Sequence, residues 1–181
     1  MNSLLKMLRK EPSKTRLITA LALAVGVTVF SAGIVWAAHP HFVGKVTATL
    51  LEDGDVKVCF KEAGLGNNTS ITYIATADSS ATYVCVNHGG QCPNAENKIT
   101  VAGPVATPGT FTSGANGQIS QCLIISPPSP GDFSCPPGQT LTFADVSYTN
   151  IAITDTTTPV GPVNAHPSSF GKVIFFTCPG P

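Results

Sequence analysis

The segment VKVCFKEAGL, residues 56–65, gives the clearest indication of the fold class of this chain. Val56, Val58 and Phe60 alternate with two lysines and a cysteine, and this period of two predicts a strand. The apolar set is expected to face a core, and the lysines and Cys59 are expected to point outward. Directly upstream, EDGD (52–55) supplies the Asp-Gly pair of a tight hairpin turn, and the β-rich run before it predicts the partner strand. The pattern therefore begins as a β-hairpin.

The rest of the chain beyond this hairpin also shows the pattern of strands separated by turns. We expect residues 71–86 to form one long strand or two short ones, and 98–105 and 109–113 to form separate short strands. Further strands are expected within 114–126, 140–158 and 172–178. The segment PPSPGDFSCPPGQ (127–139) has five prolines, which exclude a helix or a central strand there. We predict an all-β fold: a disulfide-stabilised, immunoglobulin-like antiparallel β-sandwich of seven to nine strands.

The first 37 residues differ from the remainder in composition. A basic start is followed by 22 uncharged residues, Leu17 to Ala38, and the run ends in small side chains. This is typical of a secretory signal peptide, which we expect to be helical and to be removed after Ala37, leaving one domain of residues 38–181. An uncleaved membrane anchor is the alternative, because about 20 apolar residues can span a bilayer. Both interpretations place the domain outside the cell, and secretion is the prediction.

Charge in the expected mature domain excludes one class of partner. Residues 38–181 contain five lysines, no arginine and nine acidic residues, which gives a formal charge of −4. Because nucleic-acid binding needs clustered basic side chains, we expect no nucleic-acid partner. The only tryptophan, Trp36, lies in the leader, so a flat sugar-binding platform of tryptophans is not expected.

All six cysteines follow the leader. An even count in an exported chain predicts up to three disulfides. The alternative, zinc binding, is disfavoured because no pair of cysteines has the C-x-x-C spacing. Their connectivity stays open on this reasoning. The disulfide candidates are Cys59, Cys85, Cys92, Cys122, Cys135 and Cys178.

Few residues suggest catalysis or metal binding. No G-x-S-x-G motif occurs, and we interpret Glu52, Asp53, Asp55 and Glu62 as solvated turn and strand-surface groups. We therefore predict a protein that is not an enzyme and that has no catalytic residue, no cofactor and no metal.

One alternative is a copper oxygenase that holds its metal in a brace formed by an N-terminal histidine and a second histidine. It requires cleavage after Ala38, although Trp36 would fit the −3 position poorly. Its candidate ligands are all the histidines of the chain: His39, His41, His88 and His166.

The main functional prediction is binding, or a structural role at the cell surface. The loops 88–97 and 126–139 are the expected contact regions, because loops on a rigid sandwich often carry function. Their candidate contact residues are His88, Asn94, Asp132 and Phe133, whereas Tyr83 and Tyr148 are expected to pack in the core. The partner could be an extracellular protein, a glycan or a small molecule.

Four segments resemble a group of small exported bacterial β-sandwich proteins of unknown function. They are FKEAGL (60–65), TYVCVNHGG (82–90), GDFSCPPGQ (131–139) and DVSYTNIAITDTT (145–157), and the resemblance spans residues 40–157. It implies that Cys85 pairs with Cys135; the local alternative is Cys85 with Cys92.

A weaker likeness, in style of sequence, is to the enediyne-carrying apoproteins. It implies a carrier of a small hydrophobic ligand as a further alternative, and such a carrier needs a hydrophobic cleft between its sheets.

Overall fold

The computed structural model of the chain describes residues 39–92 and 97–178. The chain divides into two units, residues 1–37 and 38–181, and only the second contains described residues. The predicted signal segment and the candidate contact residue Asn94 therefore lie outside the described residues. Within the described ranges there is no helix long and apolar enough to cross a membrane.

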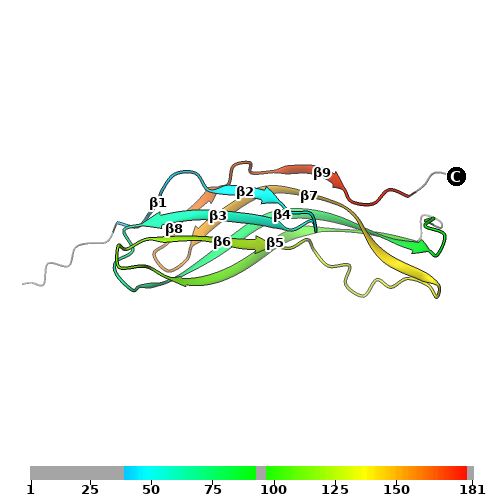
Figure 1. The fold of residues 1–181 in the computed structure, drawn as a ribbon, viewed down its shortest axis with the longest axis horizontal. Coiled ribbons are helices and arrows are strands. Elements are labelled where there is room, and N and C mark those ends of the chain that lie inside the picture. The colour runs from blue at the N-terminus through cyan, green and yellow to red at the C-terminus, as the bar shows by residue number, and fades with distance from the viewer. Residues whose placement is uncertain (1–38, 93–96, 179–181) are drawn as a thin grey trace, which may run out of the picture. The chain divides into compact units, whose positions relative to one another are not determined.

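The described chain forms two antiparallel sheets (Figure 1), which confirms the prediction of a disulfide-stabilised all-β sandwich. Sheet A has β3 (Val56–Ala63) between β6 (Ile119–Ile125) on one edge and two short strands on the other, β1 (His41–Phe42) and β2 (Thr47–Leu50). In sheet B, β4 (Ser70–Asn87) lies between β5 (Lys98–Thr112) and β7 (Gln139–Asp155). β8 (Val160–Asn164) and β9 (Phe170–Ile174) pair with the other edge of β7. The described residues form nine strands, which is within the predicted range of seven to nine.

The alternation in β3 has the predicted consequence. Val56, Val58 and Phe60 are buried between the sheets, and Lys57 and Cys59 lie on the outer side. The facing residues of β4 are Ile71, Tyr73 and three alanines, so small side chains of sheet B accommodate the larger ones of sheet A. Each fully buried aliphatic side chain of this kind contributes about 1.5–3 kcal/mol through the hydrophobic effect.

One strand of sheet B, β5, is longer than predicted. Residues 98–113 were expected to form two short strands, but β5 is a single strand of 15 residues. It tolerates Pro104 and Pro108 because it lies at the edge of sheet B, where a missing N–H need not break a ladder hydrogen bond. Residues 71–86 belong to one continuous strand, β4, which has two register irregularities.

Sheet A covers only part of sheet B. In Figure 1, strands β4, β5 and β7 continue to the right beyond β3 and β6. Over this extension the inner face of sheet B is covered by the proline-rich segment 126–138. The Tyr83 hydroxyl donates a hydrogen bond to the Pro128 carbonyl (2.9 Å), and Cys85 forms a disulfide with Cys135.

The three disulfides leave no free cysteine. Cys85–Cys135 is the pair that the family resemblance implied, and the local alternative of Cys85 with Cys92 is wrong because Cys92 pairs with Cys178. Cys59 bonds its direct register partner Cys122 across β3 and β6, on the outer face of sheet A. This disulfide joins two strands that are already hydrogen-bonded, whereas Cys92–Cys178 fixes the C-terminal tail.

Candidate functional site

The four histidines do not gather into a metal centre. His41 lies in β1, and its ring Nδ1 is 2.8 Å from the His39 carbonyl oxygen. The ring of Phe42, next to His41, lies 6.4 Å from the ring of Tyr73 in β4. His88 follows the other end of β4, because Asn87 is 14 residues beyond Tyr73, roughly 45 Å along an extended strand. His166 is exposed, and its backbone bridges to β2 through Val46 and Ala48. Across residues 39–92 and 97–178, no three His, Cys, Asp or Glu side chains are placed to hold one metal ion.

The described residues of the two predicted contact loops meet at one end of sheet B, where Asn87 pairs with Gln139. Asn97 also donates a hydrogen bond to the Gln139 side chain (3.2 Å). His88 and Asp132 are exposed, and Phe133 is half-buried. The proline-rich loop is already engaged as a cover for sheet B, so only part of its surface remains for a partner.

A buried polar cluster between the sheets was not predicted. Glu62 was interpreted as a solvated strand-surface residue, and that interpretation is wrong: it is fully buried (0 % exposed). The signal was present, because Glu62 continues the inward series of Val58 and Phe60. Neither carboxyl oxygen of Glu62 has a hydrogen-bond partner, and the hydroxyl of the equally buried Tyr73 also has none.

Asp155 is the second buried acid of this cluster, but its carboxylate is well satisfied. It accepts hydrogen bonds from the backbone N–H groups of Thr157 (2.7 Å) and Thr158 (3.1 Å) and from the Thr158 hydroxyl. The pKa of Glu62 is raised, mainly by desolvation and further by the charge of Asp155, while Tyr73 and His41 oppose the rise. The same burial raises the pKa of Tyr73. With Glu62, Tyr73 and Asp155 all sealed from solvent, the cluster affects stability and offers no entry for a ligand.

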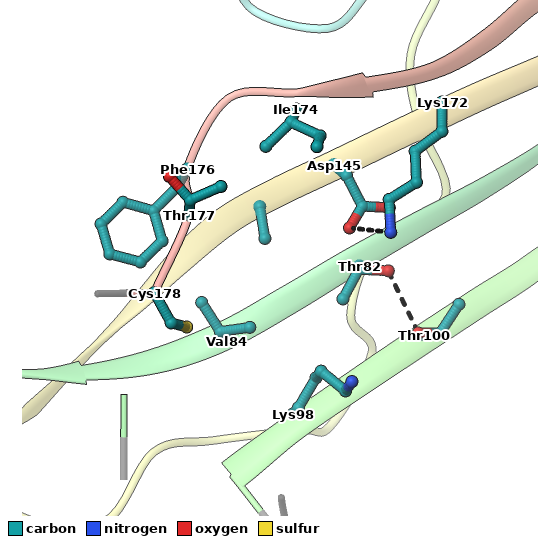
Figure 2. A pocket seen from close by; sticks show the side chains of 11 residues that line it. Thr82, Val84, Lys98, Thr100, Asp145, Lys172, Ile174, Phe176, Thr177 and Cys178 are labelled. Carbon is teal, nitrogen blue, oxygen red and sulfur yellow. Dashed lines mark hydrogen bonds and ion pairs between the residues drawn. The ribbon is translucent and has the colours of Figure 1, made fainter. Parts of the chain in front are cut away.

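A hollow opens on the outer face of sheet B, beside the C-terminal tail (Figure 2). We call it the tail hollow, and its volume is about 280 Å³. Four strands and the tail that follows β9 contribute to it. Its lining residues are Thr82, Val84, Lys98, Thr100, Ala144, Asp145, Lys172, Ile174, Phe176, Thr177 and Cys178.

Strand register explains how these side chains meet. Thr82 on the central strand β4 is paired with Thr100 on one side and with Asp145 on the other, and Asp145 is paired in turn with Ile174. Directly paired residues of adjacent strands point to the same face of a sheet, so four strands present their side chains together. The Cys92–Cys178 disulfide then holds the tail as a wall.

The polar groups of the tail hollow are partly paired with one another. Lys172 Nζ lies 3.1 Å from a carboxylate oxygen of Asp145, and the hydroxyls of Thr82 and Thr100 are 3.1 Å apart. Figure 2 shows Lys98 at one side of the hollow and the Phe176 ring at another. One carboxylate held by a lysine cannot provide the two carboxyl groups of a glycosidase, but charged, hydroxyl and apolar groups together can bind a small polar ligand.

Comparison with known proteins adds no relative: no family model, no curated protein and no solved structure matches the chain. The tail hollow was not predicted from the sequence. Its residues are scattered from Thr82 to Cys178, and they share no local motif.

Proposed function

We propose that this protein is an exported, non-enzymatic binding protein of the cell exterior, and that the tail hollow contacts its ligand. The observation that carries the proposal is the hollow itself, in which Lys98, an ion pair and two threonine hydroxyls surround an apolar floor on a disulfide-fixed sheet. Ligand sites of proteins typically combine such a concave apolar surface with a few polar groups.

The compartment belongs to the same proposal. Three disulfides that use every cysteine favour an oxidising environment, as outside the cell. Residues 1–37 serve as the signal peptide in this proposal, or as an anchor that keeps the domain at the outer surface. The sandwich is of immunoglobulin-like type and belongs with the small exported bacterial proteins that it resembles.

No observation favours the two alternative functions. A carrier of a hydrophobic ligand needs space between the sheets, but Phe60 and Tyr73 lie there with ring centroids 4.4 Å apart, and Phe42 and Phe111 pack around them. For a copper brace, His41 lies beside His39, but His88 lies at the far end of β4, and across residues 39–92 and 97–178 no three His, Cys, Asp or Glu side chains are grouped around one ion.

The test compares the wild-type protein with Thr100→Trp, which places a large side chain at the rim of the hollow. Thr112→Trp is the matched control, because Thr112 is an exposed threonine at the other end of the same strand. Each protein is applied to arrays of immobilised glycans, peptides and small molecules, and its thermal unfolding is recorded.

We expect wild type and Thr112→Trp to bind the same array members and Thr100→Trp to lose them while remaining folded. Binding that Thr100→Trp retains in full would remove the hollow from the proposal. Turnover of any substrate that a point substitution abolishes would overturn the non-enzymatic assignment.

A further inference from the structure

The tail hollow carries an excess of positive charge. Lys172 is neutralised by Asp145, since their charged atoms lie 3.1 Å apart. Lys98 is exposed at the opposite side, and none of the described carboxylates lies within ion-pair distance of its ammonium group. A ligand that complements the hollow therefore presents one negative charge to Lys98, and neutral or partly positive groups elsewhere.

Hydroxyl groups line the side of the hollow next to that charge. Thr100 is exposed, and it shares one hydrogen bond with Thr82, which is only 7 % exposed. A threonine hydroxyl has one proton and two lone pairs, so this pair keeps unused hydrogen-bonding capacity. The exposed Thr177 adds another hydroxyl from the tail. A ligand with several adjacent hydroxyls would satisfy these groups.

The remaining wall is apolar. Ile174 is 57 % exposed, the largest exposure among the exposed large apolar side chains of the described chain, and the half-buried Phe176 ring stands beside it. Val84 of β4 also lines the hollow, next to Cys178 in Figure 2. An aromatic face has a negative quadrupole and attracts the weakly positive C–H groups of a sugar ring. The ligand therefore has an apolar face as well as a hydroxylated edge.

We propose, resting on the proposed binding function, that the tail hollow recognises a hexuronic acid unit of an extracellular polysaccharide. A hexuronate combines one carboxylate, vicinal hydroxyls and a C–H face within a single ring. A volume of about 280 Å³ suits one such unit, since pockets for drug-sized ligands span roughly 300–1,000 Å³. A phosphate ligand is less well matched, because it prefers an arginine fork or a nest of backbone N–H groups.

The inference is tested by two-dimensional amide NMR titration of the disulfide-intact protein. Three probes are titrated separately: D-glucuronate, D-glucose and acetate. For a ligand of this size we expect a Kd for glucuronate on the order of 1 mM. The expected shifts concentrate on the amides of Thr82, Thr100 and Asp145, with glucose at least about tenfold weaker because it lacks the charge. A uronic acid oligomer, titrated as a fourth probe, is expected to bind more tightly than the free sugar if the polysaccharide is the source.

Two variants separate the charge from the fold. Lys98→Gln is expected to weaken glucuronate binding at least about tenfold and to leave glucose binding unchanged. Lys61→Gln removes an exposed lysine from the outer face of sheet A and should leave both affinities unaltered.

Equal affinity for glucose and glucuronate, or full affinity in Lys98→Gln, would overturn the acidic-sugar assignment but leave the proposed binding function intact. The absence of a saturable shift with glucuronate or its oligomer would also overturn the acidic-sugar assignment. If, in addition, the wild-type protein bound no member of the arrays, the proposed binding function would be overturned too.

Discussion

Replacing Glu62 with glutamine should stabilise the protein at neutral and alkaline pH. The carboxyl group is fully buried, and neither of its oxygens has a hydrogen-bond partner. An ionised carboxylate in such a place lacks water and any ion-pair or hydrogen-bond partner, and the only charge that favours it, that of His41, acts more weakly, so ionisation is costly. Desolvation therefore raises its pKa, and the carboxylate of Asp155 raises it further. Tyr73 offsets this only in part, since no hydrogen bond of ordinary geometry joins the two side chains.

The sign of the pH dependence follows from proton linkage. Below pH 4.5, the ordinary pKa of the group, Glu62 is protonated in both the folded and the unfolded state. Above that pH the unfolded chain releases the proton while the folded protein retains it. The free energy of unfolding then falls by up to about 1.4 kcal/mol per pH unit, until the pH passes the raised pKa of the folded state. Stability from this group is therefore present in acid and is lost as the pH rises.

The assay is thermal unfolding of wild type and Glu62→Gln at intervals from pH 4 to pH 9. Because the other carboxyl groups are common to both proteins, the difference in Tm isolates position 62. We expect the two proteins to unfold at similar temperatures near pH 4. The variant should then gain roughly 3–7 °C per pH unit over wild type until the raised pKa is passed. Glu52→Gln, in the exposed turn before β3, is the matched control and should track wild type throughout.

A Tm difference between Glu62→Gln and wild type that does not change with pH would refute the reasoning. It would mean that Glu62 has the same pKa in the folded and unfolded states, and hence that the carboxyl reaches solvent or a partner.

Three further substitutions test contacts elsewhere in the fold. Tyr83→Phe removes the hydrogen bond to Pro128, so it should lower the free energy of unfolding in urea by about 0.5–1.5 kcal/mol. It should also hasten proteolysis within the proline-rich loop, and an unchanged cleavage rate would show that the loop does not depend on this hydrogen bond. Gly54→Ala should cost roughly 1–3 kcal/mol by the same measurement, because φ is +91° and a Cβ would lie 2.5 Å from the Phe143 ring. Asp155→Asn weakens the charge-assisted bonds to the turn after β7, so a loss of about 1–3 kcal/mol is expected, and a neutral result would contradict the geometry of that turn.

The fold class was predictable because it depends on a local pattern. The alternation of Val56, Val58 and Phe60 requires only that one face of β3 be buried, and the structure has that arrangement. The same pattern also placed Glu62 on the inner face, but residue type suggested solvation instead. Burial of an acid depends on how much of a sheet its partner sheet covers, which is a tertiary property. Strand parity was therefore the better guide at this position.

Long-range features were harder to predict for a related reason. The sequence predicted two short strands, 98–105 and 109–113, but an edge strand leaves alternate N–H groups without a partner, so β5 continues through Pro104 and Pro108. Which strand lies at an edge depends on the order of strands in the sheet, and no single segment encodes that order. The pairing of Cys92 with Cys178 is also non-local, since 86 residues separate the two cysteines.

The two sheets differ in length, and this difference bears on where the tail hollow lies. β4 has 18 residues and β3 only 8, so sheet A leaves part of the inner face of sheet B uncovered. The segment 126–138 covers that part, fixed by the Cys85–Cys135 disulfide and the Tyr83 hydrogen bond, and this structural task occupies the loop that sequence reasoning favoured for binding. On the outer face of the same extension, β9 and the tail that Cys178 fixes lie beside Thr82 and Val84, and together they form the tail hollow. The segment 126–138 thus closes the sandwich on the inner side of β4, and the concave surface of the tail hollow lies on the opposite, outer side.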